Sequence, residues 1–326
     1  MEVPVNNKVD ALWFCDGNII VRAGDHCCRV YKGFLASLST VLSDMFSLPQ
    51  TPESFEMMDG VPVVVLPDPA NEAICWLKAM LLPDFFQPYP HVVESEHLLA
   101  VLRLSHKYDV PYLRRRALEH LAAYFLVHVD AVQAEYKSGP YAMHLQKPIY
   151  HFLALAHNVA DEIGALWLIP CAVYKLHEHI CQMPELLDFL PDIPDSSALQ
   201  IAKRLYKLLN LVPVHFPDGP MLRGRDHCQC MQVQDPGIIS AAAEGLRTQP
   251  LYYYDSLGCR QGGADLLRPG HEYEQAAHPC VLCSTLMRSK YSAACATFWA
   301  ALPSTLGLPD WPELLESKAR DLQVSQ

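Results

Sequence analysis

The sequence predicts an α+β fold: a small sheet capped by helices, followed by a mostly α-helical C-terminal domain. Near the N-terminus the apolar residues alternate with a period of two, and from about residue 33 they recur at helical spacing. After one more strand pattern, alternation is nearly absent and helical spacing dominates. The chain has 326 residues, of which 51% are hydrophobic. This is enough for about two packed domains.

The first predicted elements are two strands and two short helices. Residues 14–22 predict a strand, and Gly24 with Asp25 turns the chain back. A second strand is expected over residues 27–32. The spacing of apolar residues over 33–46 then predicts two short helices.

One strand and three helices complete the predicted N-terminal domain. Residues 61–66 form another strand pattern. Asn71 is expected to cap a helix that ends before Pro83. A further helix is expected from about Ser95, and a last one after Pro111.

The domain boundary is placed at the end of that last helix. No clear loop separates it from residues 127–136, and we expect a first domain at 10–128 and a helical domain at 129–326. Long helical periodicities support the second assignment. They cover residues 147–159, 162–183 and 198–211.

A series of residues near the N-terminus has a specific order and spacing. The series is Asp16, Ile19, Val21, Lys32, Leu35, Ser37, Ser39, Met45 and Phe46. It resembles the opening of a BTB/POZ domain. The phrase His106 to Leu113 resembles the link between the last two helices of that family, with Ser105 at a position that is usually alanine. Tyr31 stands where many members of the family carry histidine. The resemblance therefore implies no histidine-dependent role at this position in this chain.

Three short motifs lie near the C-terminus. They are Pro279-Cys280-x-x-Cys283, Phe298-Trp299-x-x-Leu302-Pro303 and Gly307-Leu308-x-x-Trp311-x-x-Leu314. Together they resemble the C-terminal signature of BTB proteins numerous in mushroom-forming fungi. With both ends matching, the resemblance covers nearly the whole chain, although the middle matches only in helical character.

The resemblance implies a binding function and a homodimer. In that family the domain pairs with itself through the first strand and the opening helices. Asp16 and Lys32 match an acidic and a basic residue that face one another in a pocket at that interface. Alternatively, Asp16 caps a turn and Lys32 is solvated.

A partner face is also implied at the end of the second short helix. The residues assigned to it are Leu42, Met45 and Phe46. Some members of the family use this face to hold a cullin scaffold. In this chain the helical C-terminal region is an alternative occupant of the face.

Two close cysteine pairs predict a candidate zinc site. Cys228 and Cys230 lie upstream of Cys280 and Cys283. Four thiolates make a closed tetrahedral shell, which would make the zinc structural rather than catalytic. Reduced structural thiols are the competing interpretation, and a redox or disulfide role is a third.

Charge and targeting signals narrow the function classes. The formal net charge of −11 opposes a nonspecific nucleic-acid binder. The dense basic run at residues 114–116 is expected to begin a helix, with one arginine facing water and another pairing with a carboxylate. No secretory signal and no membrane span is expected. The cysteines are therefore expected to be reduced in an intracellular protein, cytoplasmic or nuclear.

No catalytic constellation is found in the sequence. The histidines of His177-Glu178-His179 are two positions apart, whereas a shared metal on one helix face needs four. Nucleophile-elbow, phosphate-loop and dinucleotide motifs are missing. We therefore expect a non-enzymatic scaffold or transcriptional-regulatory adaptor. The alternative is the substrate receptor of a cullin-type ubiquitin ligase.

Overall fold

The computed structural model describes residues 7–48, 56–138, 144–145, 149–182, 195–215, 252–254, 260–262, 267 and 281–323. The chain divides into two compact units. The first comprises Met1–Ala123, Ala142–Lys147 and Asp321–Gln326, and the second comprises Tyr124–Tyr141 and Pro148–Arg320. The N-terminal part is a mixed sheet with helices and the described remainder is mostly helical, which confirms the predicted α+β class.

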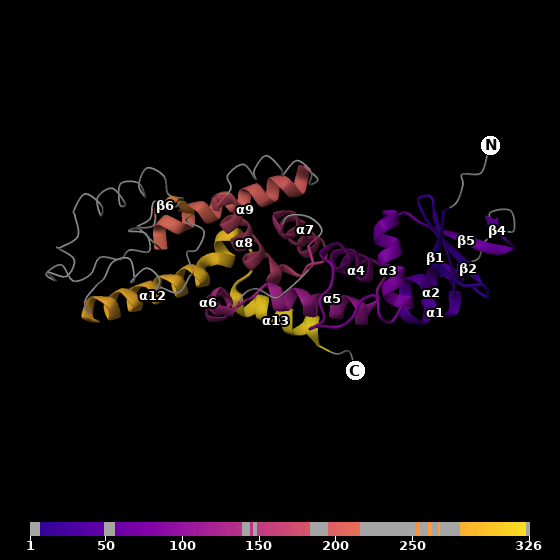
Figure 1. The fold of residues 1–326 in the computed structure, drawn as a ribbon, viewed down its shortest axis with the longest axis horizontal. Helices are drawn as coiled ribbons and strands as arrows, with labels where there is room; N and C mark the ends of the chain where they lie inside the picture. Colours follow the sequence, from indigo (N-terminus) through magenta and orange to yellow (C-terminus); the bar gives the residue numbers. More distant parts are fainter. Residues whose placement is uncertain are drawn as a thin grey trace. The chain divides into compact units, whose positions relative to one another are not determined.

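The first unit contains a five-stranded sheet (Figure 1). Its strands are β1 (Asn7–Trp13), β2 (Ile19–Ala23), β3 (His26–Val30), β4 (Met57–Met58) and β5 (Val61–Leu66). Their order is β1-β3-β2-β5-β4. Strands β2 and β3 form an antiparallel hairpin, while β1 pairs with β3, and β2 with β5, in parallel. Gly24 closes the hairpin with a φ of 57°, in the left-handed region that favours glycine.

In the first unit, strands β1 and β4 were not predicted, and the expected strand over 14–22 is partly wrong. The chain turns at residues 14–18, so that only Ile19 onward belongs to β2. Strand β1 lies before this turn at the sheet edge and is mostly exposed. It shows no apolar alternation because most of its residues are exposed and its pairing with β3 shifts register between Lys8 and Trp13. Strand β4 has two residues, which is too short for any periodicity.

Five helices belong to the N-terminal part. They are α1 (Lys32–Leu38), α2 (Thr40–Ser47), α3 (Ala70–Leu81), α4 (Ser95–Lys107) and α5 (Pro111–Tyr124). The expected cap at Asn71 is wrong, because the N-cap of α3 is Pro69, whose carbonyl accepts from the Ala73 amide. Proline is compatible with this position because its ring fixes φ near the value found there.

The motif around Tyr108 links helices α3 and α4. The buried Trp76 ring stacks on Tyr108 at 4.9 Å and donates its indole N–H to Ser105 Oγ at 3.2 Å. Lys107 and the Tyr108 hydroxyl both donate to the Asp68 carboxylate, just before α3. Ser105 is thus a buried hydrogen-bond acceptor, which an alanine would not be.

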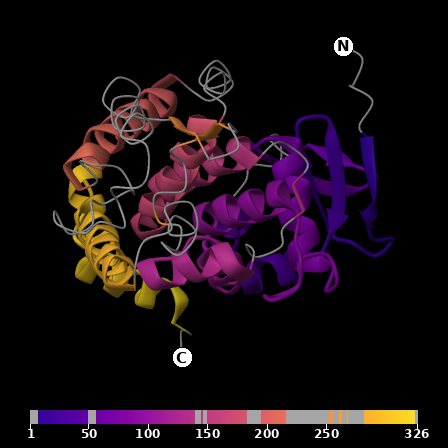
Figure 2. The same cartoon turned by 60° about the vertical axis from the view of Figure 1, so that its left-hand side comes forward.

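The second unit is mostly helical in its described part (Figure 2). Its helices are α6 (Val129–Ser138), α7 (Ile149–Glu162), the 3-10 helix η1 (Leu166–Leu168), α8 (Ile169–Gln182), α9 (Asp195–His215), α12 (Val281–Leu306) and α13 (Trp311–Leu322). A short hairpin, β6 (Tyr252–Tyr254) with β7 (Arg260–Gly262), was not predicted. Among the described helices, none combines the length and apolarity that a membrane crossing needs.

Two of the three C-terminal motifs, those that begin at Phe298 and at Gly307, form part of the core of this second unit. The side chains of the proline and the two cysteines of the other motif lie outside the described part of the chain. Phe298 and Trp299 are buried on α12. Trp299 donates its indole N–H to the Val127 carbonyl at 3.0 Å. Trp311 stacks on Trp299 at 5.5 Å and donates to its carbonyl at 2.7 Å. Trp311 is therefore used for packing within its own unit.

Candidate interaction face

A tight turn before β2 prepares the start of helix α1. An added Cβ on Gly17 would lie 2.9 Å from Arg29 Cγ and 3.0 Å from the Arg29 carbonyl, so only glycine fits there without displacement. Arg29 Nε donates to the Gly17 carbonyl at 2.8 Å. Asn18 Oδ1 accepts from the Lys32 amide at 2.8 Å, which satisfies one of the N–H groups that a helix start leaves unbonded.

Tyr31 binds the first candidate residue, Asp16. Its hydroxyl donates to Asp16 Oδ1 at 2.7 Å, and its ring lies 5.0 Å from that of Phe14. The hydrogen bond to Asp16 raises the pKa of Tyr31 above its ordinary value, because the phenol must keep its proton to donate. Tyr31 thus supplies the hydrogen-bond donor that Asp16 accepts from.

Lys32, the second candidate residue, binds the end of helix α2. Its Nζ donates to the Phe46 carbonyl at 3.1 Å and lies 5.8 Å from the Phe46 ring centre. The last carbonyls of a helix lack intrahelical partners and attract cations. Lys32 therefore joins the start of α1 to the end of α2.

The hairpin formed by α1 and α2 is anchored to the rest of the first unit. Ser39, the N-cap of α2, accepts from the Leu42 amide and donates to the Tyr108 carbonyl. Thr40 donates to Asp109 Oδ2 at 2.5 Å. Asp109, just after the end of α4, has a φ of 50°, a left-handed conformation that asparagine and aspartate tolerate better than most residues. In this conformation its carboxylate accepts from Thr40. The corner between α1 and α2 is therefore hydrogen-bonded to the end of α4.

Helix α2 exposes a line of apolar side chains. Val41 and Met45 lie at helical spacing on α2, and Leu48 is the residue that caps its C-terminus; Val41 is 39% and Leu48 65% exposed, and Met45 is half-buried. On α1, Phe34 is 45% exposed. These four residues are named the apolar stripe below. Leu42, in contrast, is 2% exposed and belongs to the core of the unit.

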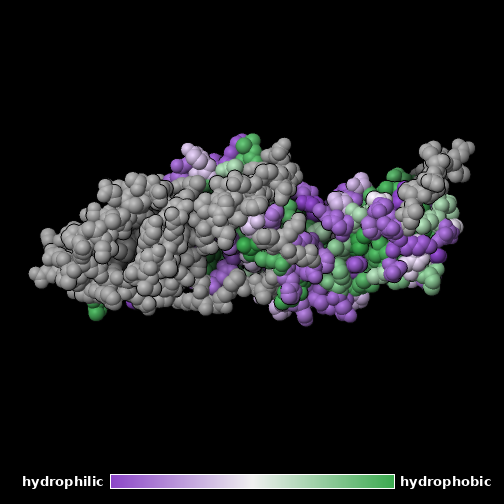
Figure 3. Space-filling view, turned by 45° about the horizontal axis from the view of Figure 1, so that its top comes forward, coloured by the Kyte–Doolittle hydropathy of each residue, from purple (hydrophilic) through white to green (hydrophobic). Residues whose placement is uncertain are grey.

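Exposed apolar residues are ordinary on protein surfaces, so their arrangement matters more than their number. Over the first unit, Figure 3 shows green apolar areas interrupted by purple polar ones. The stripe differs from such scattered exposure in that Val41 and Met45 share one face of α2 and Leu48 follows directly at its end.

The structure brings together some of the predicted site residues. Asp16, Lys32, Met45 and Phe46 lie on or beside the hairpin, whereas Leu42 points into the core. Among the described contacts, Asp16 and Lys32 form no ion pair with each other. Tyr31, Asn18, Phe34 and Val41 were missed. Val41 could have been predicted, because it precedes Met45 by four residues and so shares its helix face. Spacing alone could not have indicated Tyr31, Asn18 or Phe34.

The candidate zinc ligands lie outside the described residues. Cys228, Cys230 and Cys280 fall in segments that the structure does not describe, and for Cys283 only the helical backbone of α12 is described. In the part of the chain that is described, no three potential ligands gather. Burial raises the pKa of both Cys28 and Cys171 to about 12, so these two thiols are protonated core residues.

The basic run on α5 is engaged in contacts. Arg114 pairs with Asp321 at 2.9 Å, and Arg115 lies 3.5 Å from Glu119. Arg116 donates to the Phe86 carbonyl at 2.8 Å. These contacts leave the run poorly suited to phosphate groups.

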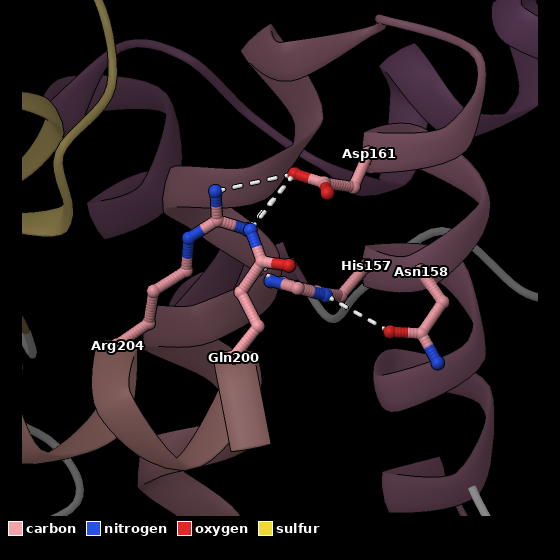
Figure 4. Close-up of polar contacts among 5 residues, drawn as sticks. All are labelled: His157, Asn158, Asp161, Gln200 and Arg204. Carbon is pink, nitrogen blue, oxygen red and sulfur yellow. Dashed lines mark hydrogen bonds and ion pairs between the residues drawn. The ribbon is translucent and has the colours of Figure 1, made fainter. Parts of the chain in front are cut away.

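A second polar cluster lies in the other unit (Figure 4). Arg204 on α9 donates to His157 Nε2 at 2.6 Å and to Asp161 Oδ1 at 3.2 Å, while His157 Nδ1 lies 3.2 Å from Asn158 Oδ1. Gln200 also reaches Asp161. His157 is 1% exposed, and the cluster contains no hydroxyl or thiol nucleophile. It therefore serves to join α7 to α9.

The comparisons with known proteins give no relative for this chain. A scan against protein-family models, a search of curated proteins and a search of solved structures each find no match.

Proposed function

We propose that this chain is a non-enzymatic protein-interaction module of the BTB/POZ kind, which pairs with a second copy of itself and acts as a scaffold or transcriptional-regulatory adaptor. The main support for the proposal is the apolar stripe. It lies on a hairpin whose two ends are joined by the Lys32–Phe46 hydrogen bond and whose corner, at Ser39, is bonded to Tyr108. Residues of the BTB-like pattern, Asp16, Lys32 and Ser39, all make contacts that shape this hairpin.

Burial of the stripe supplies a driving force for pairing. Covering a largely exposed Leu48 or Phe34 contributes on the order of 1 kcal/mol each. A two-fold axis through the hairpin would bury the same residues on both copies, because such an interface uses one patch twice. The support given by Tyr108 and Asp109 reduces the ordering cost of binding.

The test is the mass of the full chain by size-exclusion chromatography with light scattering, over a wide range of concentration. The double variant Val41→Glu with Met45→Glu is expected to dissociate the dimer. The matched control is Tyr206→Glu, since Tyr206 is 69% exposed on α9 in the second unit. Circular dichroism confirms that each variant keeps its helices. A dimer that survives the double change contradicts the proposal.

The cullin alternative uses the same stripe. Met45 and Phe46 remain partly exposed at the end of α2, so a cullin scaffold would compete there with the second copy. A pull-down with a cullin separates the two functions. Native protein that captures a cullin, with Val41→Glu losing the capture, favours the ligase receptor. No capture by native protein eliminates it.

A further inference from the structure

Helix α9 presents an exposed line of side chains in the second unit. Its buried face includes Ile201, Leu205 and Leu208, and the helix packs against α7, α8 and α12. On the outer face Leu199 is 56% and Tyr206 is 69% exposed. These two side chains lie on one side of the helix, because they are separated by about two helical turns.

The exposed line has the spacing of a helix–helix contact. Lys203 lies between Leu199 and Tyr206, and Asn210 comes after them, so that the steps alternate between four and three residues. Lys203 and Asn210 are exposed as well. A second helix lying alongside contacts side chains at this alternating spacing. These four residues are named the α9 seam, which extends over about 16 Å of helix.

The α9 seam is positively charged in a chain whose net charge is −11. Exposed Lys207 lies at its margin, with Nζ 3.5 Å from the place of a Cβ added at Gly307, directly after α12. Residues 199–211 contain no aspartate or glutamate. In the described part of the chain, neither Lys203 nor Lys207 forms an ion pair. An ammonium group that a partner covers without a counter-charge destabilises the complex, so a stable occupant has to supply carboxylates.

Helix α9 is held in position from its buried side. Arg204 extends from α9 toward α7, where it donates to His157 Nε2 and to Asp161 Oδ1 (Figure 4). Asn210 donates to the Tyr206 carbonyl at 2.9 Å, so its side chain is bound to its own helix. A seam that is ordered before binding reduces the entropy that association costs.

We infer that the α9 seam is a docking surface for an acidic amphipathic helix of another protein. Carboxylates of that helix pair with Lys203 and Lys207. Its apolar side chains cover Leu199 and Tyr206. The seam uses none of the residues of the apolar stripe, so the inference goes beyond the proposed homodimer and does not depend on it.

Other occupants fit the seam less well. A second copy of α9 would place lysines opposite lysines, and like charges oppose such a pairing. A nucleic acid is bound through many cations, whereas the seam offers two in an acidic chain. An amphipathic helix binds a membrane through its apolar face, and the apolar face of α9 is buried in its own unit.

The test is a binding titration of the full chain with a dye-labelled helical peptide. The peptide carries glutamate at the two central positions of one face and leucine at the flanking positions. A second peptide has lysine in place of both glutamates. Fluorescence polarisation is expected to give a dissociation constant below about 1 mM for the glutamate peptide, and at least about tenfold weaker binding for the lysine peptide.

Charge reversal tests the role of the two lysines. The double variant Lys203→Glu with Lys207→Glu is expected to bind the glutamate peptide at least about tenfold more weakly than the native chain does. It is expected to bind the lysine peptide about as tightly as the native chain binds the glutamate peptide. Lys290→Glu is the matched control, since Lys290 is an exposed lysine on α12 in the same unit, and it is expected to change the constant by less than about twofold.

Tyr206→Ala tests the apolar part of the seam. It is expected to weaken binding of the glutamate peptide about tenfold, because a tyrosine in a contact contributes more binding energy than most residues. Tyr206→Phe retains the ring and is expected to bind to within about threefold of the native chain. Circular dichroism checks that each α9 variant keeps its helices.

The inference is overturned if the glutamate peptide does not bind up to about 1 mM, if the two peptides bind equally, or if charge reversal leaves binding unchanged. An anionic lipid vesicle that binds the native chain but not the doubly reversed variant would assign the surface to membranes and overturn it too. The mass by light scattering is expected to stay unchanged in every α9 variant. A monomeric native chain therefore contradicts the homodimer alone, whereas the titration decides on the seam.

Discussion

Arg204 donates a hydrogen bond to the Nε2 atom of His157 at 2.6 Å, inside the second unit. Arginine is a permanent cation without an acceptor, so Nε2 must be unprotonated and the proton of the neutral ring sits on Nδ1, facing Asn158. Burial, followed by the neighbouring Arg204 charge, lowers the pKa of His157 to about 4. The junction of α7 and α9 therefore requires a neutral histidine.

This junction predicts a loss of stability in acid. The unfolded histidine titrates near 6.5, and the folded pKa lies below it, so the contribution is complete above that pH and falls as the pH drops toward 4. At pH 5 the expected loss from His157 is about 2 kcal/mol. The measurement is urea unfolding of the full chain at pH 7 and pH 5.

His157→Gln is the matched variant for this measurement, because its amide retains an acceptor for Arg204. Buried His177, whose pKa is also lowered to about 4, titrates in both proteins and cancels in the comparison. The variant is expected to lose less stability between pH 7 and pH 5 than the native chain. Equal losses in the two proteins would show that His157 does not carry the effect.

Gly17 is expected to tolerate no side chain. Gly17→Ala places a Cβ 2.9 Å from Arg29 Cγ and 3.0 Å from the Arg29 carbonyl, closer than nearly all Cβ contacts in proteins, and the expected cost is about 1 to 3 kcal/mol. Gly33→Ala is the control, since nothing lies within 4 Å of its added Cβ and the residue is inside helix α1. That change is expected to be neutral or stabilising, by up to about 1 kcal/mol. Thermal melting compares the two, and equal melting temperatures would contradict the crowding at Gly17.

Substitutions at Leu42 and Met45 are expected to have different effects, the first on stability and the second on dimerisation. Leu42→Ala removes a core side chain and is expected to lower the free energy of unfolding by about 2 to 5 kcal/mol. Met45→Glu changes a half-buried residue of the stripe and is expected to weaken the dimer at nearly native stability. Denaturant unfolding measures the first effect and light scattering the second. The opposite pattern would mean that Leu42, and not the stripe, faces the partner.

The cysteine pairs predict one bound zinc per chain. Elemental analysis of the purified protein measures it, and the variant Cys228→Ser with Cys283→Ser is expected to lose the metal. Cys28→Ser is not a suitable control because Cys28 is buried in the sheet. Cys15→Ser is suitable, since Cys15 is exposed. Native protein without zinc would leave reduced thiols as the interpretation of these cysteines.

The elements that bury several apolar residues were predictable from periodicity: the β2–β3 hairpin, strand β5 and helix α4. Helices α1 and α2 were also predicted, although each buries a single residue, Leu35 and Leu42. Strands β1 and β4 were not predictable, because an exposed edge strand and a two-residue strand carry no such pattern. The start of α3 was misplaced by two residues, since Pro69 and Asn71 are both acceptable at a helix start.

The candidate site was predictable only in outline. The pattern selected Asp16 and Lys32, but spacing does not say which donor or acceptor each one meets, and Tyr31 and the Phe46 carbonyl were not foreseen. Leu42 was wrongly assigned to the partner face together with Met45 and Phe46. One position along a helix turns a side chain by about 100°, so Leu42 is buried while its neighbour Val41 is exposed. The burial of each face depends on contacts with distant residues such as Tyr108.

The mass of the native chain in solution tests the central claim most directly. Light scattering across a wide concentration range is predicted to give twice the 36.6 kDa chain mass, falling to a single chain mass in the double variant Val41→Glu with Met45→Glu. A native chain that stays at 36.6 kDa at every concentration would contradict the account.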